Sequence, residues 1–281
     1  YLARLGNWGE DVMGGRIFDQ IRNLGLINEI RTAEAKEALV ADFWFPDTEV
    51  AGAREKEGSF SGFFFGAKGG FNAESHNHND VGSCLMYFDG KPCLIDLGRE
   101  EYVAKTFSSR RYEIWTMQSG YHNLPVINGT EQMQGENYKA KNSSFASGDK
   151  SATFTTEIAG AYPEGAKVKS WVRSYTLNRG KNFIISDKYE LNAVTNAGTS
   201  SNLITYCKVT QVKPGLLKFE GDGFTLNMSY NSRVVTPKIE FIEVIDRSLR
   251  RYWANGVTRI KLEFIKPGIK GGQKVTFTKA A

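Results

Sequence analysis

Several features that would point to common protein classes are missing from this 281-residue sequence. No run of 18 apolar residues occurs, which excludes a membrane-spanning helix in the sequence as given. No basic run of five or more residues occurs and the formal net charge is only +5, so nucleic acid is not an expected partner. Histidine is rare, with three residues in the whole chain.

Cysteine is also scarce, and the three cysteines are an odd number. Asp89-Gly90 has the composition of a two-residue hairpin turn. That turn would place Cys84 opposite Ile95 and Cys93 opposite Met86, so the two cysteines would lie diagonally. We therefore expect buried free thiols, and cysteine usage does not indicate a cellular compartment.

The first 45 residues have a helical pattern. In the whole sequence 41% of the residues are hydrophobic, which is enough to form a core. Ile17, Phe18, Ile21 and Leu24 form an apolar stripe, and a second helix is expected over residues 33–40. Two helices bury their apolar faces poorly alone. Because the chain also begins at Tyr1, we expect residues 1–45 to be the tail of a larger helical domain in a longer or processed protein.

From residue 46 onward, short apolar or alternating runs recur between turn signals such as Asn128-Gly129 and Asn255-Gly256. The clearest strand candidates are residues 60–65, 84–88, 93–97, 168–177, 183–191, 203–209, 224–229, 238–245, 259–265 and 274–278. Many short strands without intervening helices predict an antiparallel sandwich or barrel. We predict a mainly β protein in which a β-sandwich over residues 46–281 follows the helical segment.

The histidines gather near acidic residues. Two of them lie in the run Glu74-Ser75-His76-Asn77-His78-Asn79-Asp80, and the third is His122. In an extended backbone, His76, His78 and Asp80 would face the same side. Asp96 lies in an apolar run, where a carboxylate needs a partner or a metal. A metal site is one interpretation, and surface imidazoles with a hydrogen-bonded Asp96 are the other. A cupin also uses His-x-His, but the glutamate it needs is missing here.

Four blocks of residues resemble the heparinase II/III-like family of polysaccharide lyases. They are residues 67–80 around the two histidines, 94–98 around Asp96, 107–112 (Phe-Ser-Ser-Arg-Arg-Tyr) and 118–123 around His122. They lie within a stretch of about sixty residues, and a helical piece followed by a sandwich also fits the family. The resemblance implies an N-terminal (α/α) toroid joined to an antiparallel β-sandwich, and cleavage of uronic-acid polysaccharides by β-elimination.

The resemblance also implies roles for individual residues. His78, Asp96 and His122 match the family's ligands for one zinc ion, which has a structural role. His76 matches the active-site histidine, and Tyr112 falls where some members place a tyrosine that contacts substrate. Asn77, Asn79, Asp80 and Asn123 are candidates to hydrogen-bond the ligating imidazoles.

Charged residues near these blocks suit an acidic polysaccharide. Arg110 and Arg111 are expected to bind carboxylates or sulfates, although a solvated edge is an equally good interpretation. Glu74 is expected to contribute to substrate binding or to orient His76. The resemblance implies action on glycosaminoglycan, alginate or another uronate in the periplasm or outside the cell. The sequence does not indicate which polysaccharide is cleaved or the oligomeric state.

Two alternatives remain open beside the lyase. One is a non-catalytic carbohydrate-binding β-sandwich with a structural metal, and the other is a metal-dependent hydrolase of unrelated type. In the family the catalytic tyrosine and other substrate-binding residues come from the toroid, of which this chain holds a remnant. We therefore expect the full-length protein to be the lyase and the isolated chain to be inactive or nearly so.

Overall fold

The computed structural model describes residues 39–280 and seven positions before them, Ile17, Ile21, Gly25, Leu26, Glu29, Arg31 and Thr32. These seven are helical, and the rest of the helical prediction for residues 1–38 lies outside the described residues. Leu39 and Val40 are not helical, unlike the prediction. The chain divides into two compact units, Tyr1–Val40 and Ala41–Ala281. The second unit thus begins slightly before the predicted boundary, because its first strand starts at Asp42.

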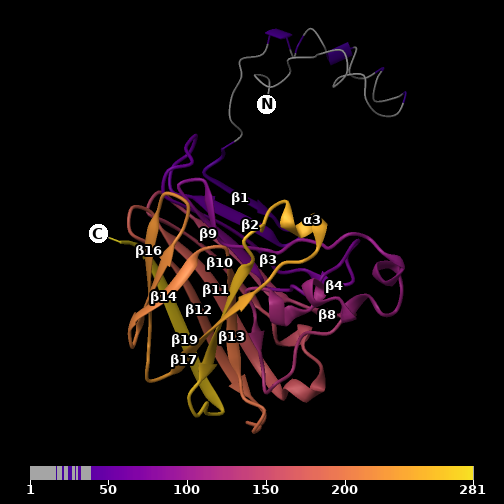
Figure 1. Cartoon of the computed structure of the whole chain (residues 1–281), viewed down its shortest axis with the longest axis vertical. Helices are drawn as coiled ribbons and strands as arrows, with labels where there is room; N and C mark the ends of the chain where they lie inside the picture. The colour runs from indigo at the N-terminus through magenta and orange to yellow at the C-terminus, as the bar shows by residue number, and fades with distance from the viewer. Residues whose placement is uncertain are drawn as a thin grey trace. The chain divides into compact units, whose positions relative to one another are not determined.

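Ala41–Ala281 is built almost wholly from antiparallel strands (Figure 1). The first large sheet has the order β1 (Asp42–Phe45), β2 (Val50–Arg54), β3 (Phe63–Lys68), β5 (Cys84–Phe88), β6 (Lys91–Leu94), β13 (Ser200–Thr205), β18 (Val257–Phe264) and β17 (Val235–Ile242), with β7 (Pro125–Val126) paired to β13. The second has the order β14 (Lys208–Lys213), β15 (Leu216–Glu220), β16 (Thr225–Tyr230), β19 (Lys270–Lys279), β12 (Asn182–Leu191), β11 (Val168–Asn178), β10 (Ser151–Glu157) and β9 (Lys141–Ser147).

The main hydrophobic core lies between these two sheets, which confirms the predicted mainly β, antiparallel sandwich. Phe65, Met86 and Leu94 from the first sheet pack in one cluster with Tyr175 and Phe277 from the second. Each such buried side chain contributes about 1.5–3 kcal/mol. A short pair of strands, β4 (Phe71–Asn72) and β8 (Gly135–Lys139), and a single helical turn, α3 (Arg247–Arg250), complete the unit.

Alternating side chains explain the long central strands. In β11, Trp171, Arg173 and Tyr175 are buried while their neighbours are only partly buried, the pattern of a strand with one face on a core. The run Phe63 to Phe65 follows the same rule: Phe64 is only partly buried. A continuous apolar run of this kind is typical of a strand buried on both faces, but here only one face packs on the core.

The hairpin between β5 and β6 contains a bulge. Tyr87 pairs with Pro92 as the Asp89-Gly90 turn predicts, but Met86 pairs with Leu94. Cys93 is therefore an extra residue, and the predicted pairing of Cys93 with Met86 is wrong. All three cysteines are free and buried, as expected for the thiols.

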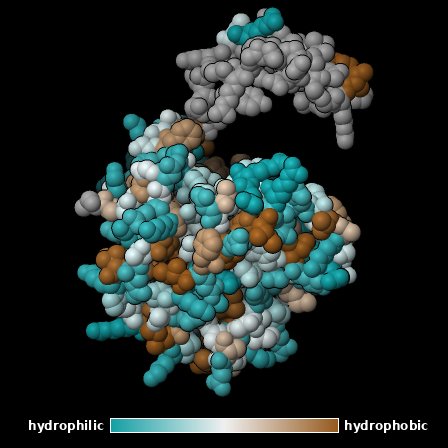
Figure 2. All heavy atoms as spheres, viewed as in Figure 1, coloured by the Kyte–Doolittle hydropathy of each residue, from teal (hydrophilic) through white to brown (hydrophobic). Residues whose placement is uncertain are grey.

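The surface carries both hydrophilic and hydrophobic side chains. On the face shown in Figure 2, hydrophobic residues of Ala41–Ala281 lie in separate groups among hydrophilic ones. Among the described residues, no helix is long and apolar enough to span a membrane.

Candidate metal centre and the adjoining cavity

Two connecting segments of the first sheet carry the candidate site. Residues 73–83, between β4 and β5, form turns, and residues 95–124 contain four 3-10 turns at Ala104–Phe107, Arg111–Glu113, Trp115–Met117 and Ser119–Tyr121. The expected extended backbone at residues 76–80 is therefore wrong. His76 has a left-handed φ of 57°, and Asp80 forms an ion pair with Lys68. The regular alternation that would direct His76, His78 and Asp80 to one side is therefore absent from this segment.

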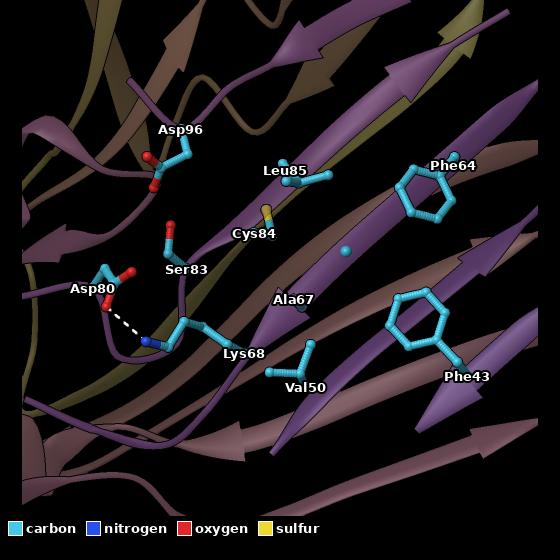
Figure 3. A pocket seen from close by; sticks show the side chains of 11 residues that line it. Phe43, Val50, Phe64, Ala67, Lys68, Asp80, Ser83, Cys84, Leu85 and Asp96 are labelled. Atoms are coloured by element: carbon cyan, nitrogen blue, oxygen red, sulfur yellow. Dashed lines mark hydrogen bonds and ion pairs between the residues drawn. The ribbon is translucent and has the colours of Figure 1, made fainter. Parts of the chain in front are cut away.

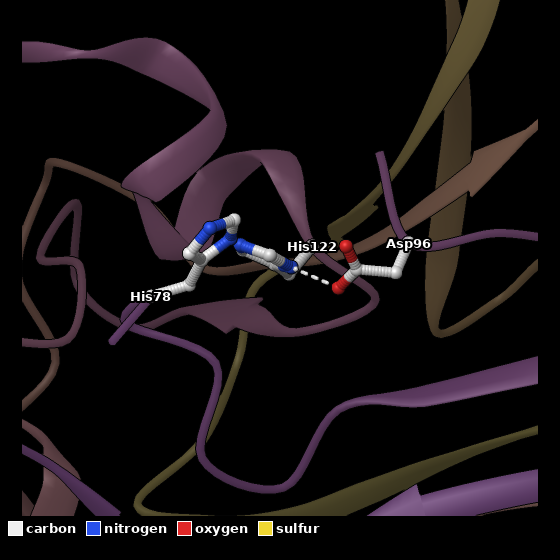
Figure 4. A group of neighbouring side chains, drawn as sticks. All are labelled: His78, Asp96 and His122. Carbon is white, nitrogen blue, oxygen red and sulfur yellow. Dashed lines mark hydrogen bonds and ion pairs between the residues drawn. The ribbon is translucent and has the colours of Figure 1, made fainter. Parts of the chain in front are cut away.

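His78, Asp96 and His122 converge although they lie in three different parts of the sequence (Figure 4). One ligand atom from each lies within 4.8 Å of the others. The two imidazole rings lie 5.4 Å apart between centroids, and His122 Nδ1 lies 3.1 Å from Asp96 Oδ2. Two imidazoles and a carboxylate form a donor set that suits zinc.

The hydrogen bonds of His122 fit metal binding through Nδ1. His122 Nε2 lies 3.1 Å from the carbonyl oxygen of Thr116, which only an N–H can satisfy. With the proton on Nε2, Nδ1 has a free lone pair on the side of Asp96. Zinc bonds of about 2.0–2.1 Å place tetrahedral ligand atoms about 3.3 Å apart, close to the separation of Nδ1 and the carboxylate oxygen. The three residues therefore fit a zinc ion.

The pKa values of all three side chains in this group are shifted from their ordinary values. Burial lowers the pKa of His78, and the neighbouring His122 lowers it further. Burial opposes the charge of His122, but Asp96 outweighs that effect and raises the pKa of His122. Burial also opposes the charge of Asp96, yet His122 holds the pKa of Asp96 well below its usual range. The group thus presents a carboxylate anion and an imidazole that favours its neutral, ligating form.

Asn123 anchors the segment that carries His122. Its side-chain amide donates to the carbonyl oxygens of Cys84 and Ile95 at 2.6 and 3.0 Å, and its Oδ1 accepts from Ile204 N at 2.7 Å. Asn123 therefore joins the ends of β5 and β6 to β13, rather than bonding an imidazole. The partner of His122 is the Thr116 carbonyl, which no side-chain pattern in the sequence indicates.

A polar cavity of about 520 Å³ lies beside the metal group. His76, Glu74, Arg111 and Tyr112 are among the residues that line it. Tyr112 accepts a hydrogen bond of 3.1 Å from the side chain of Asn77, which follows His76 directly. The structure thus brings together four of the five residues predicted for catalysis and substrate binding.

Arginine side chains in this region are already engaged. Arg111 donates twice to the carbonyl oxygen of Asn77, at 3.0 and 2.8 Å, and once to that of Thr106 at 2.9 Å. It therefore holds the histidine-bearing loop, a role that the sequence did not suggest. Arg110 is absent from the cavity lining and pairs with Glu113. Glu74 forms an ion pair with Lys68 at 2.8 Å.

A second cavity, of about 310 Å³, lies over strands β1, β2, β3 and β5 (Figure 3). Asp96, Asp80 and Lys68 are at one end of it, where Lys68 and Asp80 form an ion pair. Its other lining side chains include Phe43, Val50, Phe64 and Leu85. Because this lining is mostly apolar, it suits an acidic sugar less well than the polar cavity around His76.

Comparisons with known structures agree with this architecture. The chain is similar to a heparan sulfate lyase mutant from Pedobacter heparinus, with a TM-score of 0.67 and 14% identity over 94% of this chain and 42% of that one. A heparinase III structure gives a TM-score of 0.67 and 15% identity over 93% of this chain and 40% of that one. At such identities the likeness shows the fold, and this chain spans about two fifths of each neighbour.

The comparison with curated proteins gives no match. In contrast, the family model described as "Heparinase II/III-like, C-terminal" matches residues 39–236, which is more than half of the chain. That range contains the His78, Asp96 and His122 group and the residues that line the polar cavity. The chain therefore belongs to the heparinase II/III-like family and carries its C-terminal domain.

Proposed function

We propose that this chain is the C-terminal part of a polysaccharide lyase that cleaves uronic-acid polysaccharides by β-elimination. The observation that carries the proposal is that one loop supplies both a residue of the candidate metal group and a residue of the polar cavity. His78 joins Asp96 and His122 in a group that fits a zinc ion, while His76, two residues earlier, lines a polar cavity with Tyr112. Zinc, the polysaccharide substrate and a periplasmic or secreted location are parts of this proposal.

The residues of the cavity suit the chemistry of elimination. Removal of the proton at C5 of a uronate builds negative charge on its carboxylate, and donors placed there stabilise the transition state. His76 would supply such a donor or act as the base, and Tyr112 would hold a proton close to the leaving oxygen at C4. A bound zinc would supply positive charge that holds His78, Asp96 and His122 together and so fixes the loop that carries His76.

Lyase activity is tested on the full-length protein with uronic-acid polysaccharides, by the ultraviolet absorbance of the unsaturated product. We expect turnover there and little or none from the 281-residue chain, because the resemblance implies that the helical domain supplies the opposite side of the cleft. Robust turnover by this chain would contradict that expectation. Polysaccharide binding without any unsaturated product would favour the non-catalytic carbohydrate-binding module instead.

Metal binding is tested separately, by metal analysis of the purified chain. We expect about one zinc per chain in the wild type, and a His78→Ala variant that has lost it. His76→Ala is the matched control, because it removes the neighbouring imidazole and leaves the three ligands in place. Equal zinc content in the wild type and in His78→Ala would refute the metal assignment.

A further inference from the structure

Tyr102 lies directly against His76, which lines the cavity that we assign to substrate. Its hydroxyl oxygen is 3.3 Å from His76 Nδ1. The two rings are stacked, with centroids 6.1 Å apart and an interplanar angle of 18°. Tyr102 precedes the 3-10 turn Ala104–Phe107, so the contact joins two separate segments of the chain.

The position of the Tyr102 ring is itself defined by neighbours. The guanidinium carbon of Arg99 lies over the ring, 4.0 Å from its centroid, which is a cation–π contact. Phe107, which lines the cavity, meets Tyr102 edge to face at 5.2 Å. Tyr102 is 43% exposed, so its contact with His76 lies near the protein surface. Arg99 and Phe107 thus support the Tyr102 ring in the position from which its hydroxyl reaches His76.

The chemistry of the two groups decides the direction of the hydrogen bond. An imidazole nitrogen is a much stronger base than a phenol oxygen, so the phenol O–H donates and Nδ1 accepts. A neutral imidazole that accepts at Nδ1 carries its proton on Nε2. His76 is among the residues that line the cavity, so we take that N–H as the donor to a ligand there.

We infer that Tyr102 is a positioning residue that holds His76 in the tautomer with the proton on Nε2, so that His76 donates a hydrogen bond to the carboxylate of a uronate. This inference rests on the proposed function. It separates the two roles considered for His76, since an Nε2 that carries the proton donates to the carboxylate and does not remove the C5 proton. The base must then be another group.

The tautomer is measured on the 281-residue chain itself by long-range 1H–15N correlation after labelling with 15N-histidine. Three histidines give few signals, and a His76→Gln variant assigns those of His76. At about pH 8, above the ordinary imidazole range, we expect His76 to have a protonated Nε2 and an unprotonated Nδ1. In Tyr102→Phe, which keeps the ring stack, the shifts of the two nitrogens move toward each other as the tautomers mix.

Tyr252→Phe is the matched control, because Tyr252 is 70% exposed and its ring lies tilted beside that of Trp253 instead. It should leave the His76 signals unchanged. A proton on Nδ1 in the wild type, or identical His76 signals in Tyr102→Phe, would overturn the inference. No substrate enters this measurement, so it stands or falls separately from β-elimination. In the full-length lyase we expect Tyr102→Phe to lower kcat about tenfold and to change KM less than about twofold.

Discussion

Arg173 is a charged residue that the sandwich buries completely. Its guanidinium donates to both carboxylate oxygens of Asp187, to the carbonyl oxygen of Asn123 and to Ser201 Oγ. Burial opposes its charge, but Asp187 outweighs that effect and raises the pKa of Arg173, so it stays charged. This residue on β11 therefore ties the second sheet to β13 and to the residue that follows His122.

Replacing Arg173 should destabilise the protein strongly. Arg173→Met leaves the buried Asp187 carboxylate without its cationic partner, although Trp171 and Gln273 still donate hydrogen bonds to it, and we expect a loss of about 3–5 kcal/mol in the free energy of unfolding. Lys169→Met is the control, because Lys169 is 61% exposed where it pairs with Glu190, and it should cost less than about 1 kcal/mol. Urea unfolding of both variants measures the difference. Losses of similar size would contradict this account of Arg173.

At the scale of residues, the sequence predicts side chains better than it predicts their partners. The convergence of His78, Asp96 and His122 was expected from residue type and from the resemblance. The Thr116 carbonyl that orients His122 and the contact of Tyr102 with His76 were not expected. A backbone carbonyl has no sequence signal, and Tyr102 reaches His76 only because two irregular segments pack together.

Among the elements, β3 fixes one end of the histidine-bearing loop. The strand ends at Lys68, whose ammonium lies 2.8 Å from Glu74 and 2.9 Å from Asp80. Burial lowers the pKa of Lys68, but the two carboxylates outweigh burial and raise it. Lys68 thus joins the residues on either side of His76 and His78 to a regular strand.

Lys68→Met should remove this connection and cost about 1–2 kcal/mol in the free energy of unfolding. A raised pKa in the folded state means that the stabilisation is complete below the unfolded value of about 10.4 and is lost as pH rises through the folded value. The difference from wild type should therefore be constant between about pH 6 and 9 in urea titrations. Lys91→Met, at an exposed pair with Asp222, should have almost no effect. A difference that fades within that pH range would contradict the assignment.

Several strands with one apolar face were predicted, although β10 and β15, which have the same burial pattern, were not among the candidates. Residues 84–88 were predicted as the strand that β5 forms, and β11 and β12 differ from their predictions by single residues. β8 and β9 were missed because their side chains are mostly exposed and polar, which leaves no alternation to detect. The bulge in β6 was missed because an extra residue changes the register without changing composition.

At the scale of the molecule, the three clusters of buried residues in the described part of the chain lie within Ala41–Ala281. We therefore predict that residues 41–281 fold alone, with a midpoint of thermal unfolding within about 3 °C of that of the 281-residue chain. Zinc added at one hundred times its dissociation constant should stabilise both by about 2.7 kcal/mol. Calorimetry with and without a chelator measures both effects. A shorter chain that fails to unfold cooperatively would contradict the prediction.

The sandwich was predictable as a class because its strands alternate and its turns are marked, whereas the pairing order of the strands was not. Neighbours such as β12 and β19, or β6 and β13, are far apart in the sequence. Their pairing depends on the whole packed core, for which a local pattern contains no information. The attribution of residues 1–45 to a helical toroid stays a prediction.

The extra residue at Cys93 determines which side of the chain the Asp96 side chain faces. Side chains of an extended segment alternate, and here the apolar Ile95 and Leu97 flank the carboxylate. Removing one residue between the Asp89-Gly90 turn and Asp96 would place an aliphatic side chain beside His122. The Asp96 carboxylate would then point into the hydrophobic cluster that contains Ile95 and Leu97. Natural variation in the length of this hairpin should therefore come in steps of two.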